Sequence, residues 1–202
     1  PVAERTGQIL ELGDWILEQV LAQADAWLQR GKAALPLGLA VNVSPLQFNQ
    51  DDWGERVLER LSRARVTGRC LKLEVTESLL MANIGTAQAK MADLRTAGVS
   101  FALDDFGTGY SSLAYLQELP LDYLKVDRSF VQRIGEARAS EGIIEAVLAM
   151  AGHLGLRVIA EGVETAEQAA FLRERGCAVG QGFYWSKPLA AEEIEPLLRG
   201  GG

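Results

Sequence analysis

The chain alternates between helical patterns and short apolar runs, and this alternation limits its fold more than any other sequence feature. Apolar residues recur at helical spacing from Thr6 to Gly31. The next run, Leu37 to Ser44, is short, apolar and stopped by Pro45, which is typical of a buried strand. The alternation then predicts further strands over Leu71–Thr76, Ser100–Asp104, Tyr123–Asp127, Arg157–Glu161 and Ala178–Phe183. It predicts further helices over Asp51–Arg65, Thr86–Thr96, Ser111–Glu118, Ser140–Leu154, Ala166–Arg175 and Ala190–Leu198.

Six buried strands, each followed by a helix, indicate parallel βα units of an α/β fold. The two candidate architectures are a doubly wound open sheet and a closed (β/α)8 barrel of the TIM type. No glycine-rich fingerprint follows the first strand, which weakens the dinucleotide-binding form of the open sheet. Polar residues end nearly every strand, as they do in a barrel. A typical barrel has about 250 residues, so we expect residues 1–202 to form one barrel domain that lacks roughly two strands at its N-terminal side.

The composition is that of an ordinary globular domain with a net negative charge. Apolar residues make up 48% and charged residues 23%, which excludes disordered, collagen-like and coiled-coil chains. The formal charge of -7 argues against a nucleic-acid polymer as partner. The apolar stretch from 142 to 163 contains Glu145, His153, Arg157 and Glu161, so it predicts no membrane span. No signal peptide opens the chain, and we expect a cytoplasmic domain without membrane contact.

Soft metal donors are scarce in this sequence. Cys70 and Cys177 are far apart and match no metal-ligand spacing, which predicts two buried free thiols in a reducing compartment. The single histidine, His153, lies in a helical pattern and is expected to be a packing or surface residue.

The chemistry-bearing residues gather instead at the carboxyl ends of the predicted strands. They are Asn42, Glu74, Asp104, Asp105, Lys125, Asp127, Glu161 and Gln181. Any one of them could simply cap a helix, but a closed barrel would bring them to one mouth. Two carboxylates about 4 Å apart repel by about 4 kcal/mol at an effective dielectric near 20, so such a cluster must take up protons or cations. Oxygen ligands without histidine or cysteine select Mg²⁺, Mn²⁺ or Ca²⁺.

Lys125 has three interpretations. A lysine at the end of a barrel strand could form a Schiff base, as in an aldolase, if its amine were neutral. Neighbouring carboxylates stabilise the ammonium form and oppose that role. Lys125 fits better as a fixed cation beside a phosphate or an attacking water. The third interpretation is a buried ion pair with a purely structural role.

Six ordered strings carry these residues. They are AVNVSPLQF at Ala40–Phe48, LEVTESLLM at Leu73–Met81, ALDDFGTGYSSLAYL at Ala102–Leu116, LKVDRSFV at Leu124–Val131, VIAEGVET at Val158–Thr165 and GQGFYWSKPL at Gly180–Leu189. In these strings the chain resembles the EAL domain family, the cyclic di-GMP phosphodiesterases of bacterial signalling. The resemblance covers essentially the whole chain and implies a (β/α)8 barrel.

The resemblance also implies two divalent ions, Mg²⁺ or Mn²⁺, with Ca²⁺ inhibitory. Asn42, Glu74 and Asp104 would hold one ion, and Asp104, Asp105 and Glu161 would serve the other. Two ions about 3.5 to 4 Å apart suit an in-line phosphodiester displacement, and they let an acidic pocket accept an anionic substrate.

Further roles follow from the same resemblance. Lys125 would orient or activate the water, and Glu77 would stabilise a loop of the site. The substrate-binding positions would be Asp127, Glu164, Gln181 and Pro188. The segment from Asp105 to Ser112 resembles the one that couples the metal site to dimer contacts, which implies a homodimer.

One departure from the family pattern concerns the Glu-Ala-Leu strand that gives the family its name. Its glutamate is a metal ligand and would precede the residues PVAERTGQI with which this chain opens. The superficially similar Glu145-Ala146-Val147 lies in a helical pattern and is rejected. We therefore expect the first strands to lie upstream, in a longer protein that carries sensor or cyclase domains. Whether that protein has a membrane anchor stays open at this stage.

Two functions stay open at this stage. The first is a metal-dependent phosphodiesterase that hydrolyses cyclic di-GMP to linear pGpG, with activity of the 202 residues alone left open by the missing glutamate. The second is a receptor module that binds cyclic di-GMP without cleaving it.

Overall fold

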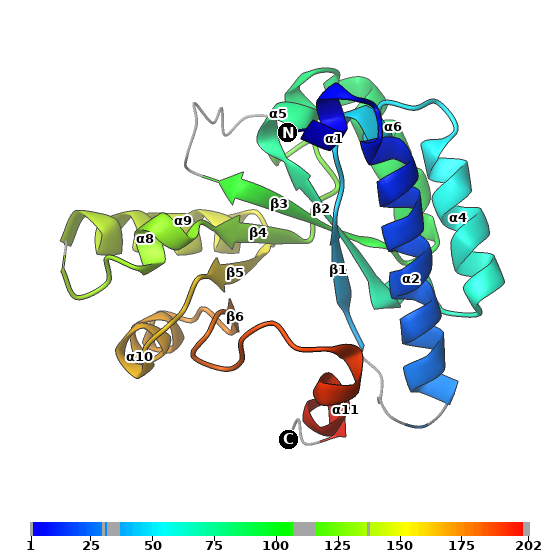
Figure 1. Cartoon of the computed structure of the whole chain (residues 1–202). Helices are drawn as coiled ribbons and strands as arrows, with labels where there is room; N and C mark the ends of the chain where they lie inside the picture. Colours follow the sequence, from blue (N-terminus) through cyan, green and yellow to red (C-terminus); the bar gives the residue numbers. More distant parts are fainter. Residues whose placement is uncertain (1, 30, 32–36, 107–115, 137, 200–202) are drawn as a thin grey trace. The chain divides into compact units, whose positions relative to one another are not determined.

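The computed structural model describes residues 2–29, 31, 37–106, 116–136 and 138–199 (Figure 1). Six strands follow one another in the sheet in their chain order, β1-β2-β3-β4-β5-β6. The chain forms two compact units, and the division falls inside β3. The first unit is Pro1–Phe101 with Leu189–Gly202, and the second unit is Ala102–Pro188.

The first unit carries two strands and the start of a third. β1 (Leu39–Asn42) pairs in parallel with β2 (Leu71–Thr76), and β3 (Ser100–Phe106) begins here. The helices of this unit are α1 (Val2–Arg5), α2 (Ile9–Gln29), α3 (Pro45–Phe48), α4 (Trp53–Ala64), the 3-10 turn η1 (Gly68–Cys70), α5 (Glu77–Met81), α6 (Ile84–Thr96) and α11 (Ala191–Arg199).

Helix α2 lies beside α4 and buries one face of its length (Figure 1). Its buried residues recur at helical spacing: Gly13, Leu17, Leu21, Ala24 and Trp27. On the opposite side of the contact, α4 buries Trp53, Val57 and Leu61. Apolar packing of these two stripes therefore holds the pair together.

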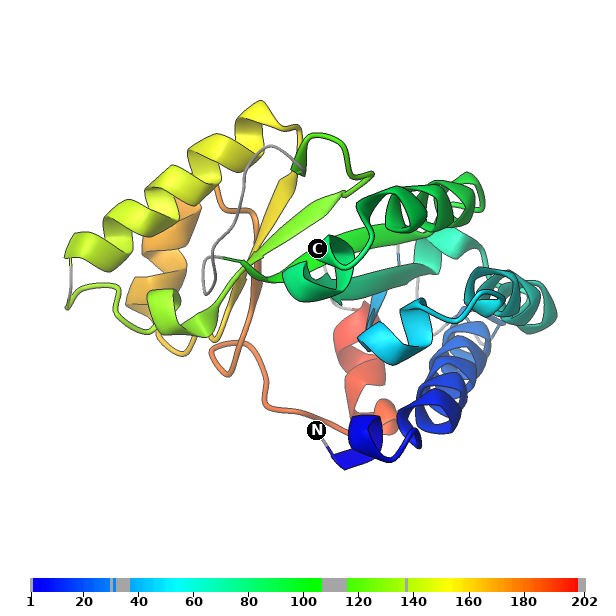
Figure 2. The same cartoon turned by 90° about the horizontal axis from the view of Figure 1, so that it is seen from above.

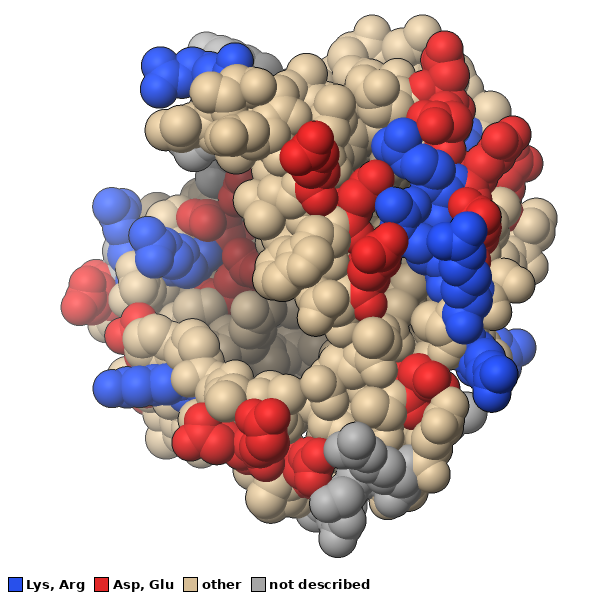
Figure 3. Space-filling model, turned by 45° about the vertical axis from the view of Figure 1, so that its right-hand side comes forward, with Lys and Arg blue, Asp and Glu red and all other residues tan. Residues whose placement is uncertain are grey.

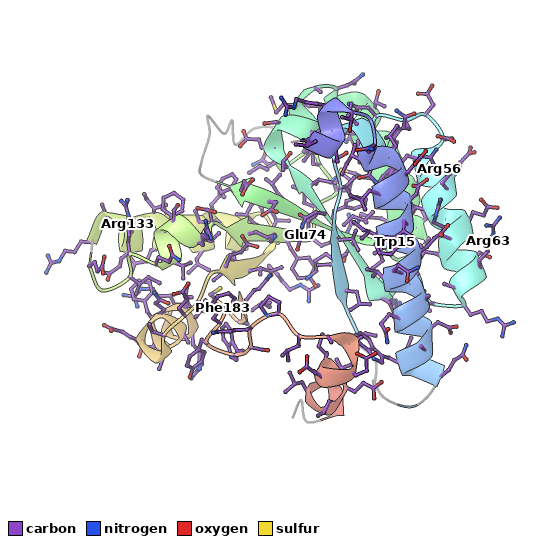
Figure 4. All side chains as sticks on the ribbon, viewed as in Figure 1. Trp15, Arg56, Arg63, Glu74, Arg133 and Phe183 are labelled. Atoms are coloured by element: carbon purple, nitrogen blue, oxygen red, sulfur yellow. The ribbon has the colours of Figure 1, made fainter. Side chains whose placement is uncertain are left out.

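Charged side chains line the outer edge of the α2–α4 contact. Arg60 lies 3.1 Å from Asp14 and 3.3 Å from Glu18, both on α2. Figure 3 shows the basic side chains as a stripe flanked by acidic ones, and Figure 4 labels Arg56 and Arg63 on α4. Ion pairs near the surface each contribute about 0 to 1 kcal/mol, so these pairs orient the helices more than they stabilise the fold.

The second unit contains the larger run of strands. β3 continues through it, followed by β4 (Tyr123–Val126), β5 (Arg157–Glu161) and β6 (Val179–Gln181). Each of these strands pairs in parallel with the next. The helices are α8 (Arg128–Val131), α9 (Arg138–His153) and α10 (Ala166–Glu174). Figure 2 shows α9 and α10 next to each other, and an ion pair of 2.6 Å joins Arg175, at the C-terminal end of α10, to Glu145 in the middle of α9.

These observations confirm the predicted fold class. Six strands occur in chain order, the described residues place helices after β1, β2, β4, β5 and β6, and the pairs β1–β2, β3–β4, β4–β5 and β5–β6 are parallel, as in consecutive βα units of a barrel. The free, buried state of Cys70 and Cys177 is also confirmed. No helix in the described part of the chain is long and apolar enough to cross a membrane. The single-domain organisation stays a prediction.

The predicted boundaries were less accurate than the predicted elements. The helix expected from Thr6 begins at Ile9 instead, after a turn in which Gly7 has φ 75°. The strand expected over Ala178–Phe183 is only Val179–Gln181, because the chain turns at Gly182. Residues 111–115 of the helix predicted over Ser111–Glu118 lie outside the described residues.

Candidate active site

The second unit brings Lys125 together with two carboxylates. Its Nζ atom lies 3.1 Å from Oδ1 of Asp104 and 2.6 Å from Oε1 of Glu161. The lysine side chain is 4% exposed, and the side chains of Asp104 and Glu161 are 15% and 21% exposed. The structure thus places three of the predicted site residues in one ion-paired cluster, which we call the Lys125 cluster.

Strand order explains why these residues meet. Lys125 is the last residue but one of β4, whose neighbours β3 and β5 carry Asp104 and Glu161. In the β4–β5 register Lys125 pairs with Ile159, and Glu161 is the next residue of β5 on the same face. The long lysine side chain therefore reaches one step further along the strand direction to the glutamate.

An irregularity in β3 brings a second aspartate to the same strand end. The paired positions Leu103 and Phe106 are one residue further apart than their partners Leu124 and Val126. This extra residue is a β-bulge, and within it Asp105 has a left-handed backbone with φ 56°. The Asp105 N–H donates a hydrogen bond of 2.9 Å to Oδ1 of Asp104, which fixes that carboxylate.

The charges around Asp105 are unbalanced toward the negative. Partial burial raises the pKa of the Asp105 carboxyl above its ordinary value, and the nearby carboxylates of Asp104 and Asp127 raise it further. The ammonium of Lys125 acts in the opposite direction but does not offset them. The carboxylates at this strand end therefore favour an added cation.

Asp127 has a local structural task. Its Oδ1 accepts a hydrogen bond of 2.9 Å from the Ser129 N–H, so it caps the start of α8. Burial acts to raise the pKa of Asp127, but hydrogen bonds from Ser129 and Arg128 and the charge of Arg128 outweigh it, so the pKa is lowered. The helix-cap alternative considered for strand-end aspartates describes this residue.

A pocket of about 260 Å³ lies beside Glu161, and we call it the Glu161 pocket. Its lining residues are Arg128, Glu161, Gly162, Glu164, Gln181, Gly182 and Phe183. Gln181 pairs with Glu161 in the β5–β6 register, so the two ends open into the same space. Pro188, expected at the substrate side, does not line this pocket.

Glu164 is held at the wall of the pocket by two glutamines. Oε1 of the buried Gln168 accepts the Glu164 N–H at 2.8 Å, and Gln132 donates from Nε2 to Oε1 of Glu164 at 3.3 Å. Gln168 also completes a capping box with Thr165 at the start of α10. The backbone of Glu164 is therefore held by Gln168, and its carboxylate accepts one exposed hydrogen bond from Gln132.

The remaining predicted residues belong to the first unit. Asn42 and Glu74 pair in the β1–β2 register, and the Glu74 side chain is buried (Figure 4). The Glu74 carbonyl accepts a hydrogen bond of 2.9 Å from the Val43 N–H, just beyond Asn42. Glu77 begins α5, directly after β2.

The chemistry and the arrangement of the donor atoms decide whether these side chains fit a metal ion. Within the described ranges no group of three or more His, Cys, Asp or Glu residues is arranged to hold an ion. The donor types still fit a hard divalent ion, since Asp104, Asp105 and Glu161 offer only carboxylate oxygens. The Lys125 ammonium takes the place between two of them. This arrangement opposes the Schiff-base alternative, because both carboxylates stabilise the charged amine.

Besides two glycines, sequence reasoning missed two residues that line the pocket, Arg128 and Phe183. Each lies one or two positions beyond a predicted strand-end residue, namely Asp127 and Gln181. Their proximity in sequence to those residues was the available signal.

Comparisons with known proteins show which family this chain is similar to. The model of the EAL domain family matches residues 1–188. Cyclic di-GMP phosphodiesterase NbdA of Pseudomonas aeruginosa is 43% identical over 198 residues, which are 98% of this chain and 25% of NbdA. This chain spans about a quarter of the length of the curated relatives it matches, at 24% and 25% for two of them.

Solved structures show the same fold. The MucR phosphodiesterase of Pseudomonas aeruginosa, in complex with c-di-GMP, superposes with a TM-score of 0.91 at 39% identity, covering 96% of this chain and 78% of that one. Klebsiella pneumoniae BlrP1, solved with manganese and cyclic di-GMP, has a TM-score of 0.78 at 30% identity and covers 90% of this chain and 45% of its own.

Proposed function

The chain belongs to the EAL domain family. We propose that it is the catalytic domain of a phosphodiesterase that uses divalent metal ions to hydrolyse cyclic di-GMP to linear pGpG. The observation that carries the proposal is the Lys125 cluster, in which a buried ammonium joins Asp104 and Glu161 beside a pocket. The substrate is supported by relatives that are named cyclic di-GMP phosphodiesterases and by related structures that contain the dinucleotide.

The metal ions are part of the proposal. Asn42, Glu74 and Asp104 would hold one ion, and Asp104, Asp105 and Glu161 would hold the other. When bound, the ions supply positive charge and Lewis acidity to a phosphate ester. We propose Mg²⁺ or Mn²⁺ as the active ions and Ca²⁺ as an inhibitor. BlrP1 has been solved with manganese and also with calcium, which supports a divalent ion of this class.

The protein's own side chains would orient and stabilise the reacting groups. Lys125 holds the two carboxylates in place and adds a positive charge beside the substrate phosphate. Gln181 and Glu164 would contact the substrate from the Glu161 pocket, and Asp127 and Pro188 would do so from outside it. Glu77 would stabilise the loop after β2.

Assembly and context are also proposed. We expect a homodimer formed through the segment from Asp105 to Ser112, of which residues 107–112 lie outside the described ones. The longer protein would carry sensor or cyclase domains. A cyclase domain is supported by the name of one relative, the bifunctional diguanylate cyclase/cyclic di-GMP phosphodiesterase MucR. We also propose that this domain works in the cytoplasm.

Product analysis tests the proposal. Purified protein, prepared as the 202 residues and with any upstream residues its gene encodes, is incubated with cyclic di-GMP and Mn²⁺ or Mg²⁺, and products are separated by chromatography. We expect linear pGpG, with no product in EDTA and less with Ca²⁺. Calorimetry run in parallel detects the receptor alternative, which would show tight binding without product. Absence of both binding and product would overturn the proposed function.

A further inference from the structure

The Glu161 pocket contains an arginine and an exposed aromatic ring to which no role has been assigned so far. We propose that Arg128 and Phe183 bind one guanine base of the substrate, and that Arg128 sets the preference for guanine over adenine. This inference rests on the proposed function, because it identifies how that site selects its substrate.

Arg128 is placed against the pocket by a close backbone contact. Gly162 has φ 67°, and a Cβ atom built on it would lie 2.5 Å from Cβ of Arg128. The glycine therefore lets the start of α8 approach the loop that follows Glu161. Among the described residues the Arg128 guanidinium makes no hydrogen bond or ion pair, although its charge acts on Asp127. Its N–H donors are thus available to a ligand.

Phe183 provides a flat apolar surface at the other wall. The residue is 57% exposed and lies in the turn after β6 (Figure 4). The turn is held tightly, since a Cβ atom on Gly182 would lie 2.0 Å from the Val163 carbonyl oxygen. The next two aromatic residues, Tyr184 and Trp185, pack edge to face on each other at 5.2 Å. An exposed ring on a rigid turn suits stacking against a base, which is worth about 1 to 3 kcal/mol per base.

The charge of the lining favours a base over a phosphate. Arg128 is the cation of the pocket, and Glu161 and Glu164 are its two carboxylates, so the lining carries a net negative charge. A phosphate placed there would meet like charges, whereas a neutral base would not. The volume of about 260 Å³ is also below the roughly 300 to 1,000 Å³ of pockets that enclose drug-sized ligands, so it suits one base.

The hydrogen-bonding groups match guanine and not adenine. The guanidinium fork can donate to O6 and N7 of guanine, both of which are acceptors. The carboxylate of Glu164, whose Oε1 accepts from Gln132, can also accept from the N1–H and the amino group of the same base. Adenine has an amino donor where guanine has O6, so Arg128 would face a donor there.

The experiment compares binding of cyclic di-GMP and cyclic di-AMP by calorimetry, together with KM and kcat for cyclic di-GMP. The variants are Arg128→Ala, Arg128→Lys and Phe183→Ala. Arg133→Ala is the matched control, since this exposed arginine lies away from Phe183 and does not line the pocket (Figure 4).

We expect Arg128→Ala to weaken cyclic di-GMP binding by about 5- to 150-fold while changing cyclic di-AMP binding far less. Arg128→Lys keeps the charge but loses the fork, so it should not restore the preference. Phe183→Ala should weaken both ligands by similar factors, because stacking does not distinguish bases. In all three variants KM for cyclic di-GMP should change more than kcat, and Arg133→Ala should match the wild type.

Two results would overturn the inference alone: an unchanged preference for cyclic di-GMP over cyclic di-AMP in Arg128→Ala, whether both affinities stay the same or fall equally, or a full wild-type preference in Arg128→Lys. A wild-type protein that neither binds nor hydrolyses cyclic di-GMP would overturn the proposed function as well. The two failures are therefore distinguished by the wild-type measurement.

Discussion

Replacing Lys125 by methionine removes the ammonium that joins Asp104 and Glu161 and leaves both carboxylates without it. At an effective dielectric near 20, distances of 3.1 and 2.6 Å correspond to gross attractions of about 5 and about 6 kcal/mol. Desolvation of the buried lysine offsets much of this attraction. Removing one partner from a buried pair costs about 3 to 5 kcal/mol. Because Asp104 and Glu161 still reach water, we expect the low end, a loss of about 3 kcal/mol in the free energy of unfolding.

Urea unfolding at pH 7 in EDTA measures this loss. Lys187→Met is the matched control, because Lys187 is exposed in the same unit, and it should change the stability by less than about 0.5 kcal/mol. Mn²⁺ at about 100 times its dissociation constant should stabilise the wild type by about 2.7 kcal/mol and recover part of the loss in Lys125→Met. A loss below about 1 kcal/mol, the range of exposed pairs, would refute the argument that Lys125 holds the site together.

Three further changes test other parts of the structure. Asp105→Asn removes a carboxyl whose pKa is raised, so at pH 7 and in EDTA it should melt higher than the wild type. The protonated Asp105 carboxyl of the wild type contributes its full stability below the ordinary pKa of 3.8, and this contribution is lost as the pH rises through the raised pKa of the folded protein. The higher melting temperature of Asp105→Asn should therefore disappear in acid. A melting temperature that does not rise, or that rises equally at every pH, would contradict this argument. Gly182→Ala should cost about 1 to 3 kcal/mol in the same unfolding assay, because its Cβ would meet the Val163 carbonyl, whereas Gly142→Ala, in open space on α9, should be neutral or stabilising; equal effects would argue against the tight turn. Burial raises the pKa of the Cys177 thiol above 9.0, so in a Cys70→Ser protein a thiol reagent should label Cys177 slowly at pH 8 and quickly in urea, and fast native labelling would be inconsistent with its burial.

The Lys125 cluster shows what the sequence could predict. The strand-end positions of Asp104, Lys125 and Glu161 followed from apolar runs and their polar ends, and their proximity followed from neighbouring parallel strands. The bulge that turns Asp105 into a left-handed backbone did not follow, because it depends on the register between β3 and β4. Pairing register is a tertiary property that the local pattern does not encode.

The Glu161 pocket shows the opposite case. Arg128 and Phe183 lie beyond strand ends, where neither periodicity nor burial marks them, and only the fold brings them to Glu161. The position of Asp127 at the end of β4 was predicted correctly, but its carboxylate accepts a hydrogen bond from the Ser129 N–H and so acts as a helix cap. A strand-end aspartate therefore identifies a location, and its hydrogen bonds identify its role.

Hydrolysis of cyclic di-GMP by Asp104→Asn, measured beside the wild type in Mn²⁺, tests most directly whether the Lys125 cluster is the chemical centre. Asp14→Asn is the matched control, since Asp14 pairs with Arg60 on the surface of the first unit. Losing a partner that only supports a ligand costs about 10- to 100-fold, so loss of a proposed ligand should lower kcat by more than about 100-fold. Asp14→Asn should keep the wild-type rate. An Asp104→Asn protein that turns over cyclic di-GMP as fast as the wild type would contradict the assignment.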